Sequence, residues 1–215
     1  MTEYLIPAKD ADAEFIERRS RFIGHIFCTD TEEQALARLK EMREAYWDAS
    51  HNVYAYIIKD GPTRFSDDGE PGGTAGMPVL QVLQREEIYN VTCVVTRYFG
   101  GILLGAGGLV RAYAHSAKLA LDTAGRAMKR VWTRVYLPCS YRWYERLKLE
   151  VAAFGGIVQN VEFGADVSFD LLLPKMQVTP FLDHVYDLSA GTIEGMTGED
   201  EYRAFPLGIE NKEGS

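Results

Sequence analysis

Three carboxylates stand close together in a glycine-rich part of the chain. Asp67, Asp68 and Glu70 lie within residues 64–76, a segment with almost no aliphatic side chains. Such a cluster can hold a hard cation through its oxygens, although its spacing does not match the loop of a calcium-binding hand. Alternatively, the aspartates accept hydrogen bonds from nearby backbone amides in a solvated turn. The sequence favours the second interpretation and leaves a metal site open.

A second glycine-rich segment, residues 96–111, leads from a predicted strand into a predicted helix. Backbone N–H groups at the start of a helix attract anions, and nearby arginines strengthen the attraction. The segment lacks the third glycine and the downstream acid of a dinucleotide fingerprint. It also lacks the Gly-Lys-Ser/Thr ending of a phosphate loop. The residues that we predict to bind an anion or a partner are Arg97, Gly105, Gly107, Gly108 and Arg111.

The same residues have a purely structural interpretation, which the sequence slightly favours. Glycines allow a strand and a helix to pack closely, and the two arginines would then pair with the acidic residues of segment 64–76. Both interpretations can hold together. In either case we expect the two segments to lie side by side, with a carboxylate of the first within ion-pair distance of Arg97 or Arg111.

The sequence contains no recognisable catalytic set. His51 and His115 are of the type that acts as a general base near neutral pH, but no serine or cysteine stands in a nucleophile elbow. The three cysteines are widely spaced among apolar residues, which is typical of a protein core and not of a disulfide or zinc framework. The sequence therefore favours a protein that is not an enzyme and that needs no cofactor.

The elements that position these segments follow from the hydrophobic pattern of the first half. Residues 21–28 alternate as in a half-buried strand, and a helix after Thr31 should bury Ala35, Leu36, Leu39 and Met42. Residues 63–78 form a long ordered loop, of the kind that is usually functional or mobile. We expect further strands over 51–58 and 91–99, the start of a helix at 79–84 and a helix over 109–124.

The second half has a different order of elements. The predicted succession is strand, helix, strand, strand, helix, strand, which is the ferredoxin-like split βαβ unit. Its strands are expected over 131–139, 157–163, 167–173 and between 192 and 205, and its helices over 141–154 and 178–188. We therefore predict an α+β protein with domains at 1–130 and 131–207, followed by a polar tail at 208–215.

Composition and charge limit the partners and the cellular location that we expect for the protein. The chain has 215 residues and a net charge of −8, which argues against general adhesion to nucleic acid. The charge is uneven, because residues 1–133 carry −2 and residues 134–215 carry −6. No apolar run of about 18 residues and no secretory signal is found. We expect a cytoplasmic protein that does not contact a membrane.

Two sequence strings resemble the signature of the YigZ/IMPACT family. One runs from Ser66 to Pro71 and continues through Gly73-Thr74-Ala75-Gly76 to Pro78; the other runs from Thr96 to Tyr113. The resemblance covers roughly residues 15–125, and the second domain is also family-like. Family members often carry lysine where this chain has Met77 and serine where it has Gly72. Because this chain lacks that lysine cation, phosphate binding by the loop is less favourable.

The resemblance implies a fold and a class of function. It implies a left-handed βαβ fold in the first domain, similar to a small-subunit ribosomal protein, domain IV of elongation factor G and the GHMP kinases. The ferredoxin-like second domain is similar to domain V of that factor. The eukaryotic branch restrains, by protein competition, the starvation-responsive kinase that shuts down translation initiation.

We therefore expect a binding protein associated with translation. It would contact the ribosome, RNA or a regulatory protein through the face around Arg97 and Arg111. Likeness of fold supports this only by association. The alternative is a phosphate- or nucleotide-binding enzyme that uses a metal held by the acidic loop, which requires both glycine-rich segments to meet in one pocket. The sequence leaves the oligomeric state open.

Overall fold

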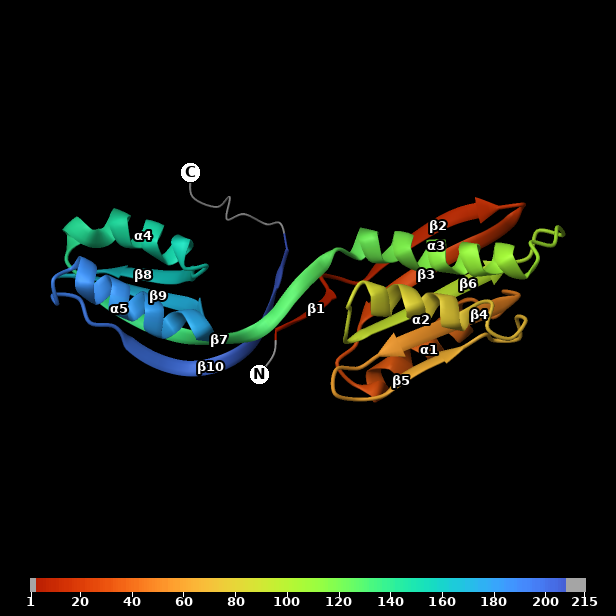
Figure 1. The fold of residues 1–215 in the computed structure, drawn as a ribbon, viewed down its shortest axis with the longest axis horizontal. Helices are drawn as coiled ribbons and strands as arrows, with labels where there is room; N and C mark the ends of the chain where they lie inside the picture. Colours follow the sequence, from red (N-terminus) through yellow and green to blue (C-terminus); the bar gives the residue numbers. More distant parts are fainter. Residues whose placement is uncertain (1–2, 208–215) are drawn as a thin grey trace. The chain divides into compact units, whose positions relative to one another are not determined.

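The computed structural model describes residues 3–207 and shows a mixed α/β protein of two compact units (Figure 1). The N-terminal domain comprises residues 4–128 together with 204–207, and the C-terminal domain comprises residue 3 and residues 129–203. The predicted α+β class and two-domain architecture are confirmed. The polar tail predicted at 208–215 lies outside the described residues.

The N-terminal domain is built on a five-stranded sheet. Its strand order is β2-β3-β6-β4-β5, and both β3 and β4 pair antiparallel with β6. Since β3 and β4 are therefore parallel and α1 joins them, they form a βαβ unit with β6 inserted between its strands. The elements are β1 (Tyr4–Pro7), β2 (Ala11–Glu17), β3 (Ser20–Cys28), α1 (Glu32–Ala45), β4 (His51–Ile57), β5 (Thr63–Ser66), α2 (Gly76–Arg85), β6 (Val91–Tyr98) and α3 (Ala106–Ala124).

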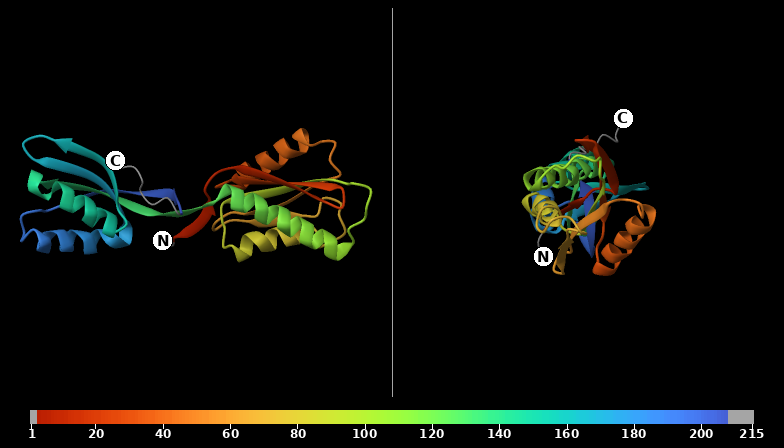
Figure 2. Two further views of the ribbon diagram at one scale, coloured as in Figure 1. Left: turned by 90° about the horizontal axis from the view of Figure 1, so that it is seen from above. Right: turned by 90° about the vertical axis from the view of Figure 1, so that its right-hand side faces the viewer.

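Helices cover both faces of this sheet (Figure 2). The larger core lies beneath α2 and α3, and a smaller one lies beneath α1, where Ala35 and Leu39 are buried. Two details of the prediction are therefore wrong. β3 is buried from Phe22 to Phe27 instead of on alternate residues, because it has a core on each side. Leu36 is exposed, because the buried stripe of α1 is narrower than expected.

The region predicted as one long loop, residues 63–78, contains regular structure at both ends. Thr63–Ser66 forms β5 at the edge of the sheet, where it pairs with β4. α2 begins at Gly76, three residues before the helix start predicted at residue 79. β2 was not predicted, because Ala11–Glu14 alternates alanines with carboxylates and has little apolar surface, as suits an edge strand with one face in water.

The C-terminal domain has the predicted ferredoxin-like arrangement. β9 pairs antiparallel with both β7 and β8, and β10 pairs with β7, which gives the order β10-β7-β9-β8 of that unit. β7 starts at Arg126, before the predicted residue 131. Its elements are β7 (Arg126–Cys139), the 3-10 turn η1 (Tyr141–Trp143), α4 (Tyr144–Ala153), β8 (Ile157–Phe163), β9 (Val167–Pro174), the 3-10 turn η2 (Lys175–Gln177), α5 (Val178–Leu188) and β10 (Met196–Pro206).

The C-terminal domain has a core of its own. Buried side chains of β7 and β9 meet those of α4 and α5 in one continuous cluster, with Phe169 and Phe181 fully enclosed. None of the helices within residues 3–207 is both long enough and apolar enough to cross a membrane.

Candidate functional site

Four connecting segments gather at one end of the N-terminal sheet. In the strand register Arg97 lies opposite His51 and Tyr98 lies opposite Arg21, so β6 ends where β3 and β4 begin. We call this region the loop end. It comprises the β2–β3 turn at residues 18–19, the α1–β4 connection at 46–50, the acidic loop at 67–75 and the glycine-rich loop at 99–105.

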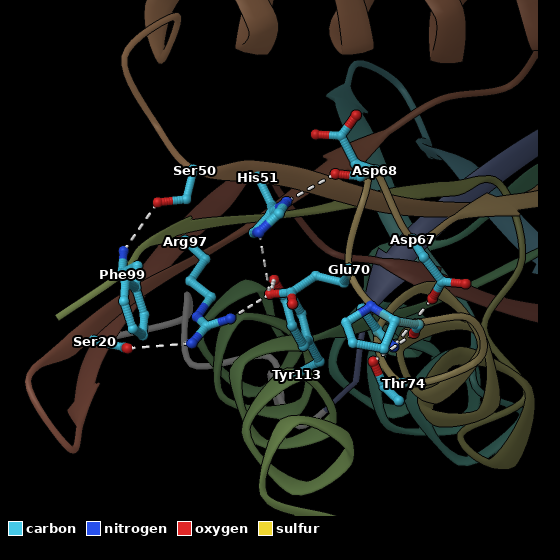
Figure 3. Close-up of polar contacts among 12 residues, drawn as sticks. Ser20, Ser50, His51, Asp67, Asp68, Glu70, Thr74, Arg97, Phe99 and Tyr113 are labelled. Atoms are coloured by element: carbon cyan, nitrogen blue, oxygen red, sulfur yellow. Dashed lines mark hydrogen bonds and ion pairs between the residues drawn. The ribbon is translucent and has the colours of Figure 1, made fainter. Parts of the chain in front are cut away.

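A buried ion pair joins the two glycine-rich segments (Figure 3). The Arg97 guanidinium donates to Glu70 Oε1 at 2.5 Å, and the Tyr113 hydroxyl donates to the same oxygen at 2.7 Å. Arg97 is 4% exposed and Glu70 is 9% exposed. The expected ion pair is therefore confirmed. Because Arg97 is enclosed and neutralised, it is not available to an anion from solvent.

The surroundings of this pair keep it fixed. His51 Nε2 lies 3.7 Å from Glu70 Oε1, and its Nδ1 is 2.8 Å from the carbonyl oxygen of Asp68. Burial, and then the Glu70 charge, raises the pKa of the Tyr113 hydroxyl, so that this group stays protonated and donates. The polar cluster therefore cross-links the acidic loop, β4 and α3.

The other two carboxylates of the acidic loop accept hydrogen bonds from backbone amides, and Figure 3 shows those of Asp67. Asp67 Oδ1 accepts from the N–H groups of Ala75 and Gly76 at 3.1 and 2.8 Å, and its Oδ2 accepts from Gly73 at 2.8 Å. Asp67 therefore satisfies N–H groups at the start of α2. Asp68 Oδ2 accepts from the Asn52 N–H at 2.6 Å. Within residues 3–207 no group of three or more His, Cys, Asp or Glu side chains is arranged to hold a metal.

Replacing Asp67 by alanine is expected to lower the free energy of unfolding by about 1–2 kcal/mol, because N–H groups at a helix start lose their acceptor. Asparagine at position 67 should restore part of the loss. Urea unfolding measures the change. Glu44→Ala is the control, because its contact with Lys40 is an exposed pair at 3.8 Å, which contributes little. Equal stabilities for the two alanine variants would contradict this role.

A cleft of about 390 Å³ lies between β2 and the first turns of α3. Four of its lining residues recur on α3 at helical spacing, so they share one face. An added Cβ on Gly108 would come within 2.9 Å of the Leu104 Cβ, so the glycine permits this close approach. The lining residues are Phe15, Glu17, Arg18, Leu104, Gly108, Arg111, Ala112 and His115.

The cleft presents positive charge. Arg18 and Arg111 are exposed, and within residues 3–207 no carboxylate lies within ion-pair distance of either, although Glu17 lines the same cleft. The first turn of α3 has no acidic residue and no capping side chain, so its N–H groups add to the positive potential. The arrangement suits an anion such as a phosphate group.

The predicted anion-site residues separate in the structure. Arg111 and Gly108 line the cleft, whereas Arg97 lies in the buried ion pair. A Cβ added at Gly107 would lie 3.6 Å from Arg111 Nη1, and Gly105 precedes α3 with a φ of +73°. Sequence reasoning missed Arg18 and Phe15, because β2 was not predicted; the pair Arg18-Arg19 just before a predicted strand was the available signal.

Two of the three cysteines are buried and poorly suited to act as nucleophiles. Burial raises the pKa of the Cys93 thiol to about 12, and burial also raises the pKa of Cys139. The carboxylates of the acidic loop do not line the cleft. In this cleft the acidic loop therefore does not meet the anion site, although the alternative of a metal-dependent phosphate-binding enzyme requires it to.

Comparison with known proteins gives two domain matches. The Impact N-terminal domain model matches residues 18–121, which include the loop end and six of the eight residues that line the cleft. A domain of unknown function, DUF1949, matches residues 137–192 in the C-terminal domain.

Similar proteins span nearly the whole chain. IMPACT family member YigZ of Escherichia coli is 34% identical over 93% of this chain and 100% of its own length. IMPACT family member YvyE of Bacillus subtilis is 31% identical over 93% of both chains. Protein IMPACT of Rattus norvegicus is 38% identical over 43% of this chain and 31% of its own length. A crystal structure of a hypothetical protein, 34% identical, matches with a TM-score of 0.59 over 93% of this chain and 98% of that one.

Proposed function

The chain belongs to the IMPACT family, and we propose that it is a cytoplasmic, non-enzymatic protein of the translation apparatus that binds RNA through the loop end of its N-terminal domain. The supporting observation is the cleft in which Arg18 and Arg111 face solvent without an acidic partner among residues 3–207. Guanidinium groups form charge-assisted, bidentate hydrogen bonds with phosphate.

Charge balance favours a contact through a local cationic site. A chain of net charge −8 repels the phosphate backbone over most of its surface, so productive binding needs a local cationic site. Arg19 lies beside Arg18 in the β2–β3 turn, and Arg111 lies one turn inside α3. Arg18 and Arg111 thus place two cations on one cleft, and Arg19 adds a third positive charge in the adjoining turn.

The link with translation is supported by the two domains together. The N-terminal βαβ domain and the ferredoxin-like C-terminal domain are similar to domains IV and V of elongation factor G, as the sequence resemblance implies. A regulatory protein is the competing partner, and affinity capture from lysate with and without nuclease separates the two, because an RNA-mediated association is lost after nuclease treatment.

Replacing Arg111 by alanine is expected to weaken binding of single-stranded RNA about tenfold, because one phosphate contact is lost. The same loss should reduce the slope of log affinity against log salt concentration by about one. Fluorescence anisotropy with labelled RNA at several salt concentrations measures both quantities.

Lys40→Ala is the matched control, because Lys40 is an exposed cation on α1 and does not line the cleft. Its affinity and salt slope should equal those of the wild type. The proposal fails if Arg111→Ala and Lys40→Ala behave alike, or if the wild-type protein binds RNA with no dependence on salt.

A further inference from the structure

Trp47 is the most exposed tryptophan of the chain. Its side chain is 82% exposed, whereas Trp132 is 2% exposed and Trp143 is partly buried. Within residues 3–207 no aromatic ring or cation stacks on it. A large aromatic surface left in water is unfavourable for a folded domain, and tryptophan is enriched among the residues that dominate binding energies.

The backbone around Trp47 is held in place on both sides. Tyr46 N–H donates to the Met42 carbonyl at 2.9 Å, and the Tyr46 carbonyl accepts from the Asn52 side chain at 3.2 Å. Asp48 accepts from the Tyr98 hydroxyl at 2.8 Å. Ser50 donates its N–H to the Arg97 carbonyl at 2.9 Å. The ring therefore projects from a turn that is fastened to α1, β4 and β6.

This turn is also tied to the glycine-rich loop. The Phe99 N–H donates to the Ser50 hydroxyl at 3.0 Å (Figure 3), and Leu103 in the same loop is 80% exposed. Arg18 donates to the Leu103 carbonyl at 3.4 Å. A continuous set of contacts therefore joins Trp47 to the cationic cleft through the loop end.

We propose that Trp47 is a stacking platform for an unpaired base of RNA whose phosphates lie at the Arg18 and Arg111 cleft. The inference rests on the proposed function and narrows its ligand to single-stranded RNA. Bases of a duplex are already stacked on their neighbours, whereas an unpaired base can stack on an exposed aromatic ring. Backbone cations combined with a separate aromatic platform are the features that single-stranded nucleic acid requires.

The polar neighbours of Trp47 favour RNA over a protein partner. Hot spots of protein interfaces lie in well-packed patches surrounded by contacts that exclude water. Trp47 lies between the half-buried Tyr46 and the exposed Asp48, and Ser50 beyond it is also exposed. One rigid ring is sufficient to stack one base.

Intrinsic fluorescence tests the proposal on the full chain. Single-stranded RNA of roughly twelve nucleotides, within the usual site size of one binding domain, should quench the tryptophan emission of the wild type. Trp47→Phe should still bind labelled RNA but lose the quenching, because Trp132 and Trp143 lie in the other domain. Trp47→Ala should weaken single-strand binding roughly 5- to 150-fold, the value of one stacked base, and leave duplex binding unchanged.

Each contrary outcome has a distinct meaning. If single-stranded RNA binds the wild type without quenching and Trp47→Ala binds it with wild-type affinity, the stacking proposal is wrong. RNA binding at the Arg111 cleft then still stands. If Trp47→Ala weakens single-strand and duplex binding equally, the stacking proposal is also overturned. If Trp47→Ala instead abolishes capture of a nuclease-resistant protein and leaves RNA affinity unchanged, the ring belongs to a protein interface. If the wild type binds neither single-stranded nor duplex RNA, both the proposed function and the stacking proposal fail.

Discussion

Replacing Glu70 by alanine is expected to lower the free energy of unfolding by about 3–5 kcal/mol, the cost of leaving a buried charge without its partner. Among residues 3–207 the Arg97 guanidinium would keep one side-chain hydrogen bond, to the Ser20 hydroxyl at 3.3 Å, and its Nε already lacks a partner. It would also keep its contacts with the Phe22 and Phe99 rings. Tyr113 would lose its acceptor as well. Urea unfolding followed by far-UV circular dichroism measures the loss.

A double variant separates the charge from the packing. Replacing Glu70 by leucine and Arg97 by methionine together removes both charges, so it should cost much less than either single change. Because the pair is enclosed, the loss in Glu70→Ala should depend little on salt. A double variant as unstable as the single ones would mean that the charges themselves hold the loop end together.

The same comparison tests the functional assignment. If Arg97 and Glu70 serve only to cross-link the loop end, the double variant should bind RNA nearly as well as the wild type once it is folded. Loss of RNA affinity in a stable double variant would instead show that Arg97 reaches the ligand, as the sequence first suggested.

The C-terminal domain was the more predictable half of the fold. Its strands alternate clearly, and Gly155-Gly156, Gly164 and Gly191 stand where elements end, so local propensity agrees with the final structure. The start of β7 was missed, because residues 126–130 are mostly polar and carry no strand pattern of their own. Pairing with neighbouring strands, which a local pattern does not contain, is what extends it.

The candidate site was only partly predictable, because charge and spacing identify residues but not their burial. Opposite charges correctly indicated that the acidic loop meets Arg97, yet nothing in the sequence distinguishes the buried Arg97 from the exposed Arg111. That distinction arises because Arg97 ends a central strand beneath α3, whereas Arg111 lies on the face of α3 that borders the edge strand β2. Trp47 follows a helix, where a tryptophan often joins the core, and its exposure depends on a turn fixed by distant partners.

Replacing Gly100 by alanine is expected to lower the free energy of unfolding by about 3 kcal/mol or more, at the upper end of the range for overpacking. The new Cβ would lie 2.0 Å from the Arg19 carbonyl carbon and 2.1 Å from its oxygen. These are backbone atoms, so relief requires the β2–β3 turn and the glycine-rich loop to separate. The hydrogen bond from the Gly100 N–H to the Ser20 hydroxyl, at 3.2 Å, would be strained by the same movement.

Because this contact sets Arg18 and Arg19 against the glycine-rich loop, Gly100→Ala should also weaken RNA binding at temperatures where the variant is still folded. Gly72→Ala is the matched control, since nothing lies within 4 Å of its added Cβ and its backbone needs no positive φ. That variant should be neutral or slightly more stable, by up to about 1 kcal/mol, through the reduced entropy of its unfolded chain. Wild-type stability together with wild-type RNA affinity in Gly100→Ala would show that the turn and the loop are free to separate, and that RNA binding does not need them fixed against each other.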